Sequence, residues 1–250
     1  MQDIAGKMKS NTNRMKRIVI YLVLVPFLTA SCQKILFNEE ESTREIRFEN
    51  FHAVKFSGIY NIILIQDSTN RLVITGKKDV NSIDAIVKND TLIIDDHKKI
   101  SFNPNKNTLA LHFKNLQFMV TYDPVNVSNT DTLKADYFLY EAIGEIAEVR
   151  LTVACNYFSV VNSANTLGYF YFNGITNSST FFNRYGSVIF ADRLLCRNAE
   201  IINESIGDVH INASETIKAY ILGPGNICYY GAPLIEISEK RGDGRLIRLY

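Results

Sequence analysis

The feature that most restricts the fold of this chain is a glycine that returns about every 19 residues, each time at the head of an alternating strand. Gly168, Gly186, Gly207, Gly225 and Gly244 are spaced by 18, 21, 18 and 19 residues. The second residue after each glycine is apolar, and the fourth is apolar in every repeat but the last: Phe170, Val188, Val209, Ile227 and Leu246, then Phe172, Phe190, Ile211, Tyr229 and Arg248. An apolar face of period two that recurs at this interval predicts a strand returning to the same place on each turn of a solenoid.

A second strand is predicted ten residues after the glycine, where Cys196, Ile217 and Ile235 are apolar. Gly144 and Ile146 are interpreted as the start of an earlier, less regular turn. Two or three short strands per turn predict an all-β, right-handed β-helix, or β-solenoid, whose turns stack about 4.8 Å apart. An antiparallel sandwich is the alternative, although its hairpins have no reason to keep one residue at one phase.

The predicted domain covers residues 46–250 and divides into a strand-rich part at 46–143 and the regular repeats at 144–250. In the first part, short apolar segments are separated by polar breaks, and Asn89-Asp90 between two such segments signals a hairpin. Uncovered strand edges invite aggregation, so this part is expected to cap the solenoid. Arg245 and Arg248 are expected to protect the last strand by their charge.

Residues 1–31 are predicted to be an export signal. Basic residues precede the apolar run at 18–30, which is too short to span a bilayer as a helix. Cys32 follows small residues at the end of the run, as in a bacterial lipoprotein signal whose cysteine is acylated and becomes the mature N-terminus. The alternative is a plain secretory signal with a chance cysteine. Met15 is a more usual start than Met1, so residues 1–14 are interpreted as a mis-called start, with Met8 as another choice.

Acylation of Cys32 would make the membrane a partner of the chain, because each buried CH₂ contributes about 0.8 kcal/mol. Residues 32–45 are then a linker, and the expected location is the outer membrane. The acidic cluster of the linker is delayed to Glu39–Glu41, so both the periplasmic face and the cell surface stay open.

The charge balance argues against a nucleic-acid partner, since Lys+Arg 27 against Asp+Glu 26 leaves no basic excess. The cysteines and histidines show no ligand spacing, so no metal or other cofactor is predicted. Cys155, Cys196 and Cys228 are expected to be buried free thiols. The first two share a phase but lie about two turns apart, beyond disulfide reach.

No catalytic residue is predicted either. Polysaccharide lyases and hydrolases with a β-helix need several acidic residues on one outer face. The outward positions, one residue after each repeat glycine, are Tyr169, Ser187, Asp208, Asn226 and Arg245, and only one of them is acidic. Asp208 and His210 share a strand face and are interpreted as a solvated pair rather than an acid–base pair.

Aromatic residues suggest a binding role instead. Tyr169 and Tyr171 alternate with Phe170 and Phe172, so one pair faces inward and the other outward. Outward tyrosines can stack on sugar rings or form a protein contact; the alternative is a cross-strand aromatic ladder that only supports the fold. The predicted binding surface consists of Tyr169, Tyr171, Asp208, His210 and Asn226.

Four segments carry a family resemblance: FHAVKFSGIYNIILIQ, NDTLIIDD, GDVHINASETIKAYILGPGNICYYGAP and RGDGRLIRL. They resemble the auto-transporter adhesin head GIN domain family over Ile46 to Tyr250, most specifically in Gly207–Pro233. Asn165–Gly168 and Arg184–Gly186 lack the Gly-Ser-Gly-Asp form, which predicts irregular middle turns. The resemblance implies a β-helix domain, common among exported lipoproteins of Bacteroidetes, and no settled activity.

Together these observations predict a non-catalytic envelope lipoprotein whose β-helix surface serves adhesion or the binding of a glycan or protein. A polysaccharide-active enzyme with a shallow groove is the first alternative. The second is a periplasmic structural component that acts through homo- or hetero-oligomeric contacts.

Overall fold

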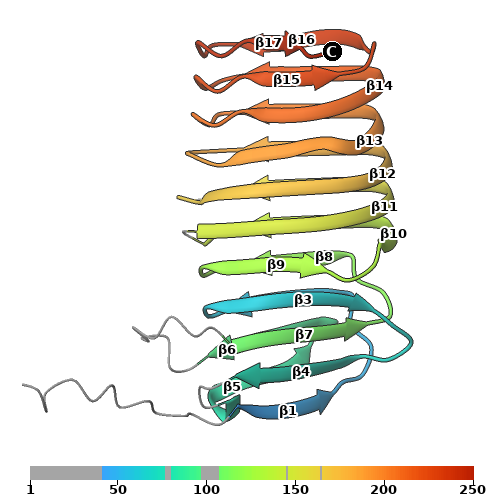
Figure 1. The fold of residues 1–250 in the computed structure, drawn as a ribbon, viewed down its shortest axis with the longest axis vertical. Helices are drawn as coiled ribbons and strands as arrows, with labels where there is room; N and C mark the ends of the chain where they lie inside the picture. Colours follow the sequence, from blue (N-terminus) through green and yellow to red (C-terminus); the bar gives the residue numbers. More distant parts are fainter. Residues whose placement is uncertain (1–40, 77–79, 97–106, 145, 164) are drawn as a thin grey trace, which may run out of the picture. The chain divides into compact units, whose positions relative to one another are not determined.

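The computed structural model describes residues 41–76, 80–96, 107–144, 146–163 and 165–250, which form seventeen strands of one continuous sheet. The sheet winds into stacked coils, which confirms the predicted β-solenoid (Figure 1). Among these residues no helix is long and apolar enough to cross a bilayer. The export signal at 1–31 and Cys32 lie outside the described residues.

Parallel coils make up the C-terminal part of the solenoid. β11, β12 and β13 are long because each strand continues around a bend of its coil, and β14 pairs with both β15 and β16. The elements are β10 (Leu133–Ala142), β11 (Ile146–Asn162), β12 (Leu167–Asn183), β13 (Val188–Asn203), β14 (Val209–Ile221), β15 (Ile227–Tyr230), β16 (Leu234–Lys240) and β17 (Leu246–Arg248).

Equivalent apolar residues of successive coils form buried columns. The parallel register places Phe170, Ile189, Val209 and Ile227 in one column, all fully buried. The prediction that Val188 would stand in this column is therefore wrong. Val188 pairs with Tyr169 and is half-buried on the outer side, and the predicted inward position of Phe190 is wrong for the same reason.

The shift arises because Ser187, not Gly186, occupies the position equivalent to Gly168 and Gly207. The coils approach so closely there that a Cβ on Gly207 would lie 2.2 Å from the carbonyl oxygen of Ser187. Serine is also small, and the buried hydroxyl of Ser187 donates a hydrogen bond of 2.8 Å to the carbonyl of Thr166. A slip of one residue exchanges the two faces of a strand, so Ile189 faces the core.

Two other expectations about phase are corrected by the register. Ile217 pairs with Ile235 as predicted, but its partner on β13 is Ala199 and not Cys196, because the register between β13 and β14 shifts before and after Cys196. Ile146 is 58% exposed, since Ala147 is the residue equivalent to Gly168. The middle coils are irregular, as the departures from the family pattern indicate.

The N-terminal strands contribute further coils in an order that differs from the sequence. β2 pairs in parallel with both β6 and β8, and β3 with both β7 and β9, so the β2–β3 coil lies between two coils made later in the chain (Figure 1). The parallel stacking continues without a break from β8 and β9 to β10 and β11. These elements are β2 (Ala53–Ser57), β3 (Tyr60–Gln66), β6 (Thr91–Asp96), β7 (Asn107–Phe113), β8 (Phe118–Thr121) and β9 (Val125–Asn129).

A strand-rich cap closes this end, but it is smaller than the predicted range 46–143, because β2, β3 and β6 to β9 of that range pair in parallel as coils of the solenoid. β1 (Ser42–Arg47) and β7 flank β4 (Arg71–Gly76) in antiparallel pairs, and a 3₁₀ turn, η2 (Val80–Ser82), leads into β5 (Ile83–Lys88). The predicted hairpin joins β5 to β6, with Asn89 and Asp90 at φ 49° and 62° as a type I′ turn requires.

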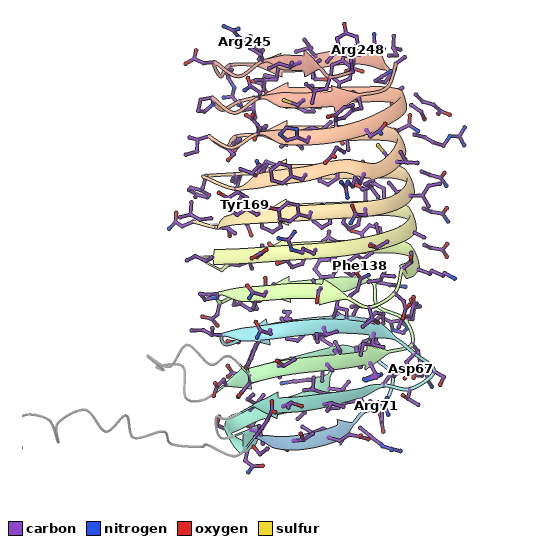
Figure 2. All side chains as sticks on the ribbon, viewed as in Figure 1. Asp67, Arg71, Phe138, Tyr169, Arg245 and Arg248 are labelled. Atoms are coloured by element: carbon purple, nitrogen blue, oxygen red, sulfur yellow. The ribbon has the colours of Figure 1, made fainter. Side chains whose placement is uncertain are left out.

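Charged side chains mark both ends of the solenoid (Figure 2). Near the cap, Asp67 contacts Arg71 at 3.6 Å and His112 at 3.0 Å, which ties the end of β3 to β4 and β7. At the other end Arg248 lies on β17 and Arg245 directly precedes it, and both are exposed. Charge at a terminal strand opposes pairing with another sheet, in line with the prediction.

A second buried column is polar. β11, β12 and β13 end at Asn162, Asn183 and Asn203, and all three side chains are fully buried. Asn162 Nδ2 donates to Asn183 Oδ1 at 3.0 Å, and Asn183 Nδ2 donates to Asn203 Oδ1 at 3.2 Å and to the Ser187 carbonyl at 2.9 Å. This asparagine ladder pairs buried amide groups of three coils and holds the coils in register, while Asn162 Oδ1 at its end has no hydrogen-bond partner among the described residues.

We expect Asn183→Ala to lower the free energy of unfolding by about 2–4 kcal/mol, because it leaves the amide of Asn162 and the amide oxygen of Asn203 short of a buried partner. Denaturant unfolding followed by circular dichroism measures the change. Asn177→Ala is the matched control: Asn177 donates to Asn156 Oδ1 at 2.9 Å on an exposed ladder, and its loss should cost less than about 1 kcal/mol. Equal effects of the two substitutions would contradict the role of the buried ladder.

Candidate functional site

Two outward columns run side by side along one side of the coils, and together we call them the ladder face. Each column is set by the parallel register, since every second residue of a strand points outward. Outer column one is Asn126, Glu148, Tyr169, Val188, Asp208 and Asn226; outer column two is Ser128, Arg150, Tyr171, Phe190, His210 and Cys228.

All five residues of the predicted binding surface lie on the ladder face. Tyr169, Asp208 and Asn226 stand in outer column one, whereas Tyr171 and His210 stand in outer column two. The predicted alternation is confirmed, because the side chains between the tyrosines, Phe170 and Phe172, are fully buried. Ser187 is the exception among the predicted outward positions: it is buried, and Val188 takes its place.

Outer column two is a continuous stack. The Arg150 guanidinium lies 4.1 Å from the centre of the Tyr171 ring, which stacks on Phe190 at 5.0 Å and 9°. Phe190 in turn stacks on His210 at 5.1 Å and 20°. Both faces of the Tyr171 ring are therefore occupied, and Tyr171 presents its edge and hydroxyl. Tyr169 is 54% exposed, and no ring contact of it is found within the described residues.

Hydrogen bonds order outer column one near the C-terminal coils. The backbone N–H and side-chain amide of Asn226 donate to Asp208 Oδ1 at 2.7 and 3.2 Å. The backbone N–H of Arg245 donates to Asn226 Oδ1 at 3.0 Å. Asp208 is thus fixed by the next coil rather than by His210, and no hydrogen bond between Asp208 and His210 exists in the structure.

The ladder face is hollowed on both sides of Arg150. One groove, of about 390 Å³, lies against Arg150, Tyr171 and Phe190, with Asn173, Asp192 and Arg193 as its polar rim. A second groove, of about 400 Å³, is lined by Glu148 and Arg150 together with residues of β3, β7 and β9. Grooves that combine apolar surface with charged and amide groups are typical of sites for polar ligands.

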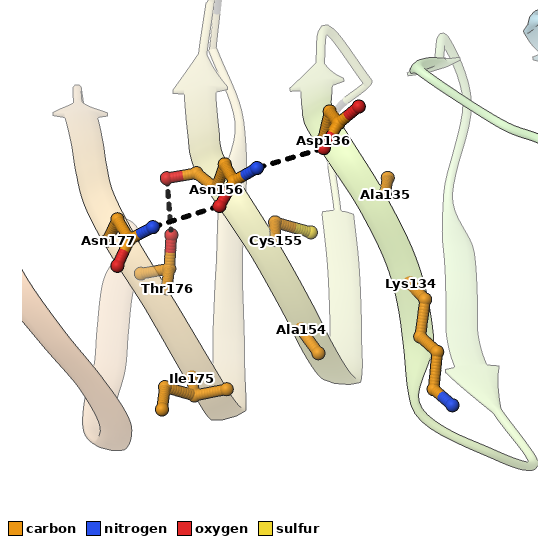
Figure 3. A pocket seen from close by; sticks show the side chains of 9 residues that line it. All are labelled: Lys134, Ala135, Asp136, Ala154, Cys155, Asn156, Ile175, Thr176 and Asn177. Atoms are coloured by element: carbon orange, nitrogen blue, oxygen red, sulfur yellow. Dashed lines mark hydrogen bonds between the residues drawn. The ribbon is translucent and has the colours of Figure 1, made fainter.

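A third hollow, of about 580 Å³, lies at the bend of β10, β11 and β12, outside the ladder face (Figure 3). Asn177 donates to Asn156, and Asn156 donates to Asp136 at 2.9 Å, so an exposed polar ladder crosses it (Figure 3). Cys155 lines this hollow and is 7% exposed, and burial raises the pKa of its thiol to about 11. Cys155 pairs with Thr176 of the next coil, and Thr176 pairs with Cys196 of the coil after that. The two cysteines therefore lie two turns apart, as predicted.

Glu148 and Asp208, the carboxylates of outer column one, are too far apart for paired acid–base hydrolysis. Glu148 and Asp208 stand in the same column with Tyr169 and Val188 between them, which separates them by three coils, or about 14 Å. Glycosidases place their two carboxyl groups about 5–9.5 Å apart. Glu148 is also paired with Arg150 of its own strand.

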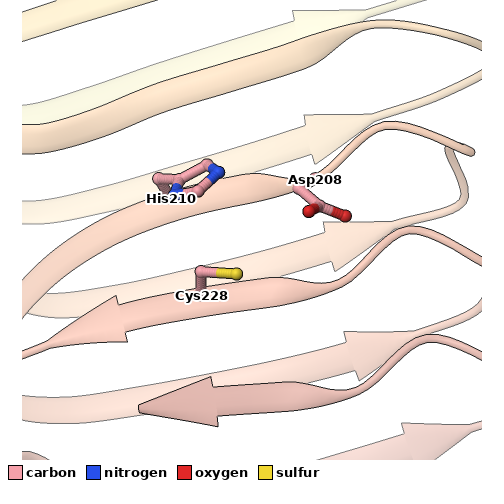
Figure 4. A group of neighbouring side chains, drawn as sticks. All are labelled: Asp208, His210 and Cys228. Atoms are coloured by element: carbon pink, nitrogen blue, oxygen red, sulfur yellow. The ribbon is translucent and has the colours of Figure 1, made fainter. Parts of the chain in front are cut away.

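The parallel stacking brings together a cluster that the sequence reading missed. Asp208 and His210 share the outer side of one coil, and Cys228 pairs with His210 on the next coil (Figure 4). Cys228 is a buried free thiol, as predicted, and burial, aided by the nearby Asp208 carboxylate, raises its pKa. The signal that finds Cys228 is the spacing of 18 residues between it and His210, which equals one coil.

These features define a parallel β-solenoid with one structured, aromatic outer face. The chain belongs to the family described as "Putative auto-transporter adhesin, head GIN domain", whose model matches residues 50–233. The family named from the sequence is thereby confirmed. No curated protein matches the chain.

Solved structures share the fold. A "putative adhesin" from Bacteroides fragilis aligns at a TM-score of 0.74 and 22% identity, over 84% of this chain and 97% of that chain. A "Putative lipid binding protein" from Parabacteroides distasonis aligns at 0.65 and 20% identity, over 85% and 98%. A "putative adhesin" from Parabacteroides merdae aligns at 0.56 and 19%, over 85% and 98%. At these identities the likeness establishes the fold.

The raised pKa of Cys155 gives a prediction for alkylation. In the folded chain the rate of reaction with iodoacetamide should rise about tenfold per pH unit and continue to rise toward pH 11, because only the thiolate reacts. In the denatured chain the rate should level off near pH 9. Peptide mass spectrometry of timed samples measures both rates, and a folded-state rate that already levels off near pH 9 would show that the thiol is solvated.

Proposed function

We propose that this protein is a non-catalytic lipoprotein of the cell envelope that binds a glycan or a protein surface through its ladder face. The observation that carries the proposal is the continuous outer face of β11 to β15, where the exposed Tyr169 ring follows Glu148 in outer column one and two grooves flank that column's neighbour, Arg150. Family membership supports an adhesin-like role. The wide separation of Glu148 and Asp208 weighs against the polysaccharide-active alternative.

The exposed aromatic surface supports this choice of face. On the second half of the coils the tyrosine rings cover one another, since Tyr137 and Tyr157 stack at 5.3 Å, although Ile175 and Leu195 are exposed there. On the ladder face Tyr169 offers a large apolar surface, and the exposed Ile146 and Leu167, paired with each other, lie at its edge. Exposed apolar surface bordered by polar groups is typical of interaction sites.

Membrane attachment is part of the proposal and rests on the lipoprotein-type sequence that ends at Cys32. Acyl chains on this cysteine would hold the solenoid at the outer membrane, on its periplasmic face or on the cell surface. The neighbours from Bacteroides and Parabacteroides are consistent with an exported protein of this group.

Substitution of Cys32 tests the anchor. Cys32→Ala should move the protein from the membrane fraction to the soluble fraction and remove the mass of the acyl chains, since no other residue in the sequence follows a lipoprotein signal. Cell fractionation and intact-mass measurement report the change, with Cys196→Ser as the thiol control. A Cys32→Ala protein that stays in the membrane fraction would rule out anchoring through this residue.

Substitution of Tyr169 tests the ladder face. A glycan array and a binding screen against extracellular matrix proteins identify the ligand, and Tyr169→Ala should then weaken its binding about fivefold, because a stacked ring contributes about 1 kcal/mol. Tyr137→Ala removes an exposed tyrosine of the other half of the coils and should leave binding unchanged. Equal losses in both variants would move the site off the ladder face.

Reducing-sugar release from the same glycans separates binding from catalysis. Turnover of any glycan would overturn the non-enzyme part of the proposal. Purification as a stable complex with other envelope proteins, with no ligand on either screen, would favour the structural alternative.

A further inference from the structure

One cluster of metal-binding side chains stands at the C-terminal end of the ladder face. One ligand atom each of Asp208, His210 and Cys228 lies within 4.8 Å of the other two. Figure 4 shows the three side chains on neighbouring coils, with the thiol and the carboxylate on the same side as the imidazole. A carboxylate oxygen, an imidazole nitrogen and a thiolate are three ligands that Zn²⁺ accepts.

The surroundings hold two of the three ligands in place. The amide groups of Asn226 fix Asp208 through Oδ1, while Oδ2 has no hydrogen-bond partner among the described residues and is free for a cation. Phe190 stacks on the His210 ring and fixes its plane. Ligands of structural and catalytic metals are commonly oriented in this way by neighbouring hydrogen bonds and packing.

The spacing of the ligand atoms is close to that of a tetrahedral site. Bond lengths of about 2.0–2.3 Å place the ligand atoms of tetrahedral Zn²⁺ about 3.5 Å apart. Closing the cluster from at most 4.8 Å therefore needs movements of about 1 Å, which small side-chain rotations supply. Cys228 is 6% exposed and lies between His210 and Ile247 in the register, so the sulfur is shielded, whereas Asp208 and His210 are partly exposed.

We propose that Asp208, His210 and Cys228 bind one Zn²⁺ ion, with a fourth coordination position open to solvent or to an incoming ligand. The thiolate makes Mg²⁺ and Ca²⁺, which prefer oxygen ligands, poor occupants. On binding, the S–H bond of Cys228 breaks, the sulfur coordinates the metal, and the proton passes to the buffer. The metal would join the coils of β14 and β15 through side chains, in addition to the backbone ladder.

Zinc titration of the full chain after chelator treatment tests the proposal. In competition with a chromophoric chelator, the wild-type chain should bind one equivalent of Zn²⁺, and binding should raise its melting temperature. Cys228→Ser should weaken binding by about a hundredfold, and Asp208→Asn by about tenfold. Cys155→Ser and Cys196→Ser remove thiols elsewhere and should change the affinity less than about twofold.

Co²⁺ gives a second readout that needs no substitution, because a thiolate ligand produces a charge-transfer absorption band. This band should appear with the wild-type chain and vanish with Cys228→Ser. If Cys228→Ser does not fold, the test rests on the Co²⁺ spectrum of the wild-type chain and on the weaker zinc binding of Asp208→Asn. Absence of saturable binding, an unchanged affinity in Cys228→Ser, or a Co²⁺ complex without the band would overturn the proposal. No glycan or protein ligand takes part, so the result is independent of the ladder-face proposal.

Discussion

The parallel backbone ladder between successive coils is the interaction on which the rest of the structure depends. It pairs each residue with its equivalent one turn away, so each column of side chains repeats one kind of environment. Inside, the columns become apolar stacks or the asparagine ladder; outside, they become the arginine–aromatic stack of outer column two. An exchange of one residue in a column therefore alters the packing of two neighbours at once, and this coupling is what keeps long strands in one register.

Close approach of the coils limits what each column accepts. The column of Gly207 consists of small residues, Ala147, Gly168, Ser187 and Gly207, and at its glycines a carbonyl oxygen of the preceding coil lies where even a Cβ would stand. Ser187 meets the limit by turning its hydroxyl to a carbonyl of a neighbouring coil. Steric restriction at one bend thus fixes the phase of the strand that follows, and with it the residues exposed on the ladder face.

The periodicity made the architecture predictable, because glycine and apolar residues at a fixed phase have one simple explanation. The periodicity predicted the wrong phase for the strand after Gly186, because the residue equivalent to Gly168 and Gly207 is Ser187, one position later. Nothing in the sequence indicates this, since the requirement for a small residue comes from the contact between coils. The five binding-surface residues could be placed on one face by alternation alone. The cluster of Asp208, His210 and Cys228 could not, since it depends on which coil lies next to which and by what offset.

The position of the β2–β3 coil has a consequence for biosynthesis. This coil leaves the ribosome before both of its neighbours, which are completed only when residues up to Phe113 and Asn129 have emerged. Until then its two edges lack their parallel partners, and the nascent polypeptide has to bring together segments tens of residues apart, which is slow because loop closure comes first. Every later coil instead docks on one that already exists. Assembly of the first coils, which needs residues up to Asn129, is therefore expected to be slow, and the addition of each later coil is expected to be faster.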